Sequence, residues 1–152
     1  MPRLPSPVME AIEFHTGIDD PVGFAVRLLR KAYRQRVRVL VTATAPVLDQ
    51  ISRQLWLAHE REFIAHVRVG CCLPGQAART SLWLATAVAE VEHEPEVVIN
   101  VGAAAPADVG RLQRLIEGVA ADAEGAAEGR QRWRQYKAAG FGVTHLNATP
   151  SA

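Results

Sequence analysis

Residues 19–46, DDPVGFAVRLLRKAYRQRVRVLVTATAP, decide the fold of this chain. Asp19 and Asp20 can cap a helix, and Pro21 suits the first turn of that helix. Apolar residues then recur at helical spacing up to about residue 35. Residues 36–43 are rich in β-branched and apolar side chains, which is typical of a buried strand. Thr44 can cap a second helix, so the stretch predicts helix, strand and helix in succession.

Strands are also expected on both sides of this unit. Residues 10–15 predict a short first strand, and Val97–Val101 is the clearest later one. Residues 63–69 and 80–88 predict weaker strands between them. The alternation of strands and helices predicts an α/β fold, in which helices cover a sheet. We expect disordered tails at residues 1–9 and 143–152, and a single domain at residues 10–142.

The composition argues against a strongly basic nucleic-acid binder, a disulfide-rich secreted protein and a membrane protein. The chain has 152 residues, enough for one domain with a real core, and its formal net charge is only +1. A basic surface must therefore be local rather than global. Cys71 and Cys72 are adjacent and belong to no C-x-x-C pair, which fits a reducing cytoplasm. No apolar run reaches the ~18 residues that span a membrane, and residues 1–30 show no signal-peptide h-region, so we expect neither a membrane span nor a secretory signal.

A basic stripe near the end of the chain is the strongest functional signal. Residues 129–141 predict the last turns of a helix that Gly140 ends, because glycine readily adopts the left-handed cap conformation. Helical spacing places Arg130, Trp133, Arg134 and Lys137 on one face. Guanidinium groups fork onto carboxylates and an indole contacts apolar groups, so this face suits an acidic peptide with an apolar end. The alternative is a solvated charged face with Trp133 partly tucked into the core.

The stripe resembles the C-terminal signature of the chi subunit of bacterial DNA polymerase III, R-x-R-W-R-x-Y-K-x-x-G-F. The matching residues are Arg130, Arg132, Trp133, Arg134, Tyr136, Lys137, Gly140 and Phe141. Residues 36–41, 55–56, 62–66 and 97–100 are similar to further segments of the family in the same order, although Ala65 stands where proline is common. The resemblance covers roughly residues 10–145.

This resemblance implies a fold and a role. The fold is a three-layer α/β/α domain with a mixed, mostly parallel sheet and a nucleotide-binding-like topology without a phosphate loop. Where pattern alone predicts one long helix over residues 108–137, the resemblance places a strand at 112–119 and a final helix at 120–139. The role is that of a non-catalytic, cytoplasmic subunit, a monomer or half of a heterodimer, that reaches DNA only indirectly.

Two partners are implied, each with its own residues. Arg130, Trp133, Arg134 and Lys137 would bind the acidic C-terminal tail of single-stranded DNA-binding protein. Tyr136 and Phe141 would either help to build that pocket or pack in the core. The absence of a basic residue at Ala126 and Ala127, where some members carry one, could weaken tail binding.

Trp56 and Phe63 match the family's aromatics that face the psi subunit, which links chi to the clamp loader. For both residues the alternative is core packing.

Two other function classes stay open. One is an α/β enzyme or nucleotide-binding protein with an unrecognised site, and the other is a direct binder of single-stranded nucleic acid, with Trp133 stacking on a base. Neither G-x-x-x-x-G-K-[ST] nor G-x-G-x-x-G after a strand occurs. The five histidines are scattered and no base accompanies the cysteines, so we expect no catalytic residue, no metal site and no cofactor.

Overall fold

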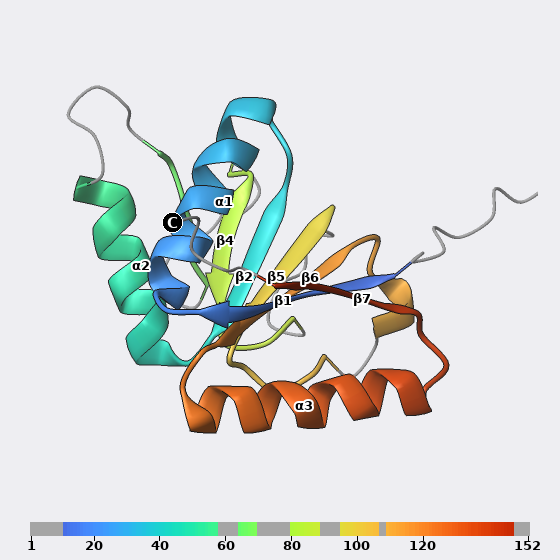
Figure 1. Cartoon of the computed structure of the whole chain (residues 1–152). Helices are drawn as coiled ribbons and strands as arrows, with labels where there is room; N and C mark the ends of the chain where they lie inside the picture. Colours follow the sequence, from blue (N-terminus) through green and yellow to red (C-terminus); the bar gives the residue numbers. More distant parts are fainter. Residues whose placement is uncertain (1–10, 58–63, 70–79, 89–94, 107–108, 148–152) are drawn as a thin grey trace, which may run out of the picture.

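A computed structural model describes residues 11–57, 64–69, 80–88, 95–106 and 109–147 (Figure 1). The strands are β1 (Ile12–Ile18), β2 (Val39–Ala43), β3 (Val67–Arg68), β4 (Leu82–Ala85), β5 (Val97–Val101), β6 (Leu115–Ala120) and β7 (Val143–Asn147). The helices are α1 (Pro21–Gln35), α2 (Ala45–Leu57) and α3 (Ala123–Ala138), with a 3-10 turn η3 (Val109–Arg111). The predicted strand at residues 10–15 thus extends to residue 18.

The strands form one seven-stranded sheet in the order β3-β4-β2-β5-β6-β1-β7. Every pairing of these strands is parallel, and the described residues add only an isolated antiparallel bridge between Ala43 and Gly102. The α/β class is confirmed, but the sheet is parallel throughout its described strands rather than mixed. Parallel strands require crossover connections. The connections that are described in full, β1 to β2 through α1 and β6 to β7 through α3, are of this kind and contain no hairpin.

Helices lie on both sides of the sheet. In Figure 1, α1 and α2 lie together on one side and α3 lies alone on the other. β1 leads into α1, whereas its neighbour β6 leads into α3, so the chain leaves these two adjacent strands toward opposite faces. In α/β sheets, ligand sites lie by the carboxyl ends of strands at such a switch point.

The predicted start of α1 is confirmed. Asp20 caps the helix by accepting a hydrogen bond from the Gly23 amide, 3.0 Å away, and Pro21 occupies the first helical position. β2 is buried along its whole length. The predicted strand at 36–43 is shorter at its start, because Arg36 instead ends α1 in the left-handed conformation, with φ of 58°.

The C-terminal region follows the resemblance rather than the pattern. Instead of one helix over residues 108–137, the structure has β6 and then α3. Gly140, with φ of 93°, follows the end of α3 as predicted. Residues 143–147 were expected in a tail, but they form β7, which pairs in parallel with β1. The expected N-terminal tail, Phe63, Cys71 and Cys72 lie outside the described residues.

Candidate functional site

A buried polar cluster fixes α3 on the sheet. The carboxylate of Glu117 on β6 is fully buried and accepts hydrogen bonds from the Arg132 Nε at 2.9 Å and the Tyr136 hydroxyl at 2.5 Å. Asn100 on β5 donates a third, at 2.9 Å. Asn100 is in turn held by the Thr42 hydroxyl at 3.1 Å. A buried charge requires such partners, so α3 is tied to one register on β6.

The cluster alters the titration of its members. Burial raises the pKa of the Glu117 carboxyl, although Arg132 and the hydrogen-bond donors favour the charged form. Burial, with Glu117 beside it, raises the pKa of the Tyr136 hydroxyl far above its usual range. Tyr136 is therefore a hydrogen-bond donor at any physiological pH. Arg132 and Tyr136 belong to the sequence motif, but both turn inward.

α3 approaches β6 closely at Gly129. A Cβ at this position would lie 2.6 and 2.9 Å from the two γ-carbons of Val119. Only glycine allows this separation, because real Cβ contacts are longer. Gly129 therefore brings the N-terminal half of α3 down onto the sheet, beside the switch point between β1 and β6.

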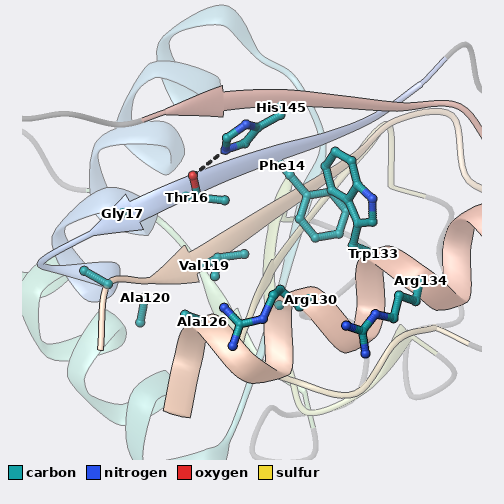
Figure 2. A pocket seen from close by; sticks show the side chains of 12 residues that line it. Phe14, Thr16, Gly17, Val119, Ala120, Ala126, Arg130, Trp133, Arg134 and His145 are labelled. Atoms are coloured by element: carbon teal, nitrogen blue, oxygen red, sulfur yellow. Dashed lines mark hydrogen bonds between the residues drawn. The ribbon is translucent and has the colours of Figure 1, made fainter. Parts of the chain in front are cut away.

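A pocket of about 560 Å³ opens between α3, β1, β6 and β7 (Figure 2). Its lining residues are Phe14, Thr16, Gly17, Val119, Ala120, Ala121, Ala126, Gly129, Arg130, Trp133, Arg134 and His145. Apolar side chains and backbone make up most of this lining, the cations come from α3, and none of the twelve residues is acidic. Such a pocket can hold an apolar group while the arginines bind a carboxylate.

The predicted stripe divides in the structure. Arg130 and Arg134 are exposed and line the pocket, as Figure 2 shows. Trp133 is half-buried and packs edge-on against Phe14, with ring centroids 5.1 Å apart. Lys137 does not line the pocket, but its Nζ lies 5.3 Å from the centroid of the Trp133 ring, in cation–π range. The four residues thus share one region, with Lys137 acting on the indole.

Tyr136 and Phe141 do not line the pocket. Tyr136 is 2% exposed, and Phe141 packs against the same core cluster. Of the two roles weighed from the sequence, core packing is therefore the one the structure has.

Sequence reasoning missed the strand side of the pocket. Phe14 and Thr16 come from β1, and His145 comes from β7, which was expected to be a tail. The His145 Nε2 lies 2.6 Å from the Thr16 hydroxyl oxygen, at hydrogen-bonding distance (Figure 2). No local motif marks these residues, because parallel pairing of the two ends of the chain brings them together.

Trp56, the described member of the second predicted site, comes from α2 on the other side of the sheet. Trp56, near the end of α2, is 57% exposed and the adjacent Leu57 is 76% exposed. The Trp56 ring packs against the His66 ring, with centroids 5.4 Å apart. Burial lowers the pKa of His66. The core alternative for Trp56 is wrong, since only Leu48, Ile51 and Leu55 of this helix are buried.

Metal binding and membrane insertion were also considered. In the described ranges, no group of three or more His, Cys, Asp or Glu side chains could hold a metal ion. None of the helices in that part of the chain is long and apolar enough to cross a membrane.

Comparison with known protein families gives one match. The family model described as "DNA polymerase III chi subunit, HolC" matches residues 9–144 of the chain. Among solved structures, "Structure of the C-terminal domain of the DEAD-box protein Dbp5" is similar with a TM-score of 0.56 and 11% identity, over 93% of this chain and 91% of that one. Identity this low shows a shared fold alone. No protein with a curated description matches the chain.

Proposed function

Since the chain belongs to the DNA polymerase III chi subunit family, and is thus of a family of polymerase accessory subunits, we propose that it binds the acidic C-terminal tail of single-stranded DNA-binding protein in the pocket beside α3. It acts as a non-catalytic cytoplasmic adaptor. Through a second surface it binds the psi subunit, and so links the tail to the clamp loader.

The pocket lining is the observation that carries the proposal. Arg130 and Arg134 lie one helical turn apart at the pocket, and neither forms an ion pair with any described residue. Both guanidinium groups are therefore available to ligand carboxylates, which they can bind in bidentate fashion. The apolar lining, which includes Phe14, Val119 and Trp133, suits the last apolar side chain of the tail.

Two features of the pocket favour a peptide over a nucleic acid strand. Trp133 packs edge-on against Phe14 and has Lys137 near its ring, whereas base stacking requires an open aromatic face. The net charge of the chain is only +1, and the pocket itself has just two arginines, Arg130 and Arg134, rather than a long basic groove.

Calorimetric titration tests the tail site. The probe is a peptide copy of the tail from the same organism, acetylated at its N-terminus, with either a free or an amidated C-terminus. Arg134→Ala should weaken binding of the free-acid peptide roughly tenfold or more, since a hydrogen bond to a charged group contributes ~1.5–3 kcal/mol. Arg38→Ala, which removes an exposed arginine that does not line this pocket, is the matched control.

Each outcome of the titration has a separate meaning. Equal binding by wild type, Arg130→Ala and Arg134→Ala would place the tail elsewhere. Equal loss on Arg38→Ala and Arg134→Ala would mean a general charge effect. Tighter binding of a single-stranded oligonucleotide than of the peptide at the same salt concentration would favour the nucleic-acid binder.

The α2 surface supports the second partner. Two large apolar side chains, Trp56 and Leu57, are exposed side by side in the sequence, and Arg53 and Arg68 border the same shallow pocket. Aromatic side chains with a charged rim are typical of binding hot spots. Phe63, matched to the same partner, lies outside the described residues and remains part of the proposal through the resemblance alone.

Substitution of Trp56 tests this surface. Trp56→Ala should abolish capture of psi in a pull-down while changing the melting temperature little, because the side chain is more than half exposed. The tail-site variant Arg134→Ala should still capture psi, because the two sites lie on opposite faces of the sheet. Retention of psi by Trp56→Ala would contradict the assignment.

A further inference from the structure

The pocket has a polar group on its strand side as well as on its helix side. Figure 2 shows His145 across the pocket from Arg130, with Thr16 beside it. In the parallel register of β1 and β7, Phe14 is opposite His145 and Thr16 is two residues further along β1. Side chains two residues apart on a strand point to the same face, so Phe14, Thr16 and His145 all face α3.

The imidazole of His145 is held in place from two directions. Its Nε2 lies 2.6 Å from the Thr16 hydroxyl oxygen, and its ring meets the Trp133 indole edge-on at a centroid distance of 6.1 Å. These contacts leave Nδ1 as the ring nitrogen with no hydrogen bond to a described residue. When the Thr16 hydroxyl donates to Nε2, the neutral ring carries its proton on Nδ1 and can donate it. When the ring is charged, both nitrogens donate.

The charges around the pocket determine which kind of ligand group can accept a hydrogen bond from Nδ1 of His145. The lining residues that carry charge are Arg130 and Arg134, and none of the described lining residues is acidic. Thr16 is therefore the only lining side chain that His145 has as a hydrogen-bond partner, and Nδ1 is left to meet an acceptor from a ligand. Resting on the proposed function, we propose that His145, held by Thr16, is a specificity-determining residue that donates a hydrogen bond to a carboxylate of the bound acidic peptide.

The described groups around His145 on the pocket side are aromatic, hydroxyl-bearing or cationic. From α3 it faces Trp133, with Arg130, Arg134 and Lys137 nearby, and from β1 it faces Thr16 and Phe14. By strand alternation the titratable residues Glu13 and His15 point to the other face, where His15 packs on Phe24 and Glu13 pairs with Arg114. Thr144 and Leu146, beside His145 on β7, carry no charge.

Calorimetric titration of the free-acid tail peptide tests the proposal. His145→Ala should weaken binding roughly three- to tenfold, because it removes the donor. His145→Gln keeps a side-chain N–H donor, so it should retain part of the affinity that His145→Ala loses. Thr16→Val should lose part of the affinity by releasing the ring. Thr144→Gln, on the opposite face of the same strand, is the matched control and should bind like wild type.

The outcomes separate this inference from the function on which it rests. If Arg134→Ala weakens binding but His145→Ala binds like wild type, the tail site stands and the role of His145 is refuted. If Thr144→Gln weakens binding as much as His145→Ala, the effect comes from β7 as a whole and the proposal is also refuted. If the wild-type chain does not bind the peptide, the proposed function itself is wrong and the inference is wrong with it.

Discussion

Replacing Gly129 with alanine should destabilise the protein, contrary to the usual effect of this substitution in a helix. In a helix interior, alanine is about 1 kcal/mol more favourable than glycine. Here the new Cβ would lie 2.6 and 2.9 Å from the γ-carbons of Val119 and 3.3 Å from its Cβ. Val119 is only 4% exposed, so it cannot turn away without disturbing a close-packed core. Overpacking of this kind costs about 1–3 kcal/mol.

The net expectation for Gly129→Ala is a loss of about 1 kcal/mol, or a melting temperature roughly 2–4 °C lower for a chain of this size. Urea unfolding of the wild type, both single variants and the double variant with Val119→Ala measures the coupling. In the Val119→Ala background the clash is gone, so Gly129→Ala should become neutral or stabilising, with a coupling energy of about 1–3 kcal/mol. A gain in stability from Gly129→Ala alone, or the same effect in both backgrounds, would refute the close approach of α3 to β6.

Two further predictions concern the polar groups. Tyr136→Phe should cost about 1–3 kcal/mol in urea unfolding, because it removes one of the donors to the fully buried Glu117 carboxylate; an unchanged unfolding midpoint would show that the hydrogen bond contributes nothing. Burial lowers the pKa of His66 below its usual 6.5, so the unfolded chain binds more protons there and stability should fall as the pH drops below about 6.5. His66→Gln should reduce the difference between urea midpoints at pH 7.5 and 5.5, and an undiminished difference would assign the effect to other groups.

The N-terminal half of the fold was readable from local signals. Asp20 and Pro21 begin α1 as predicted, because capping and a fixed proline φ act within a few residues. Val97–Val101 is a strand as predicted. β6 was not readable in this way, because the small and alanine-rich residues around it also fit a helix. It is a strand because it lies between β5 and β1, whose residues are distant in the sequence.

The candidate site was only half predictable for the same reason. Helical spacing was enough to group Arg130, Trp133 and Arg134, which line the pocket together. The inward turn of Arg132 depends on Glu117, a single acidic residue inside an apolar strand, which was a usable signal. Thr16 and His145 are separated by 129 positions and meet only through pairing of β1 with β7. Because residues after 142 were predicted to be a disordered tail, His145 was not considered as a site residue.

A crystal structure of the chain with the acidic tail peptide tests the central claim most directly. The account predicts that the peptide lies in the pocket beside α3, with its terminal carboxylate on the guanidinium groups of Arg130 and Arg134 and its last apolar side chain against Phe14 and Val119. Density for the peptide on the α2 surface around Trp56, with the α3 pocket empty, would contradict it.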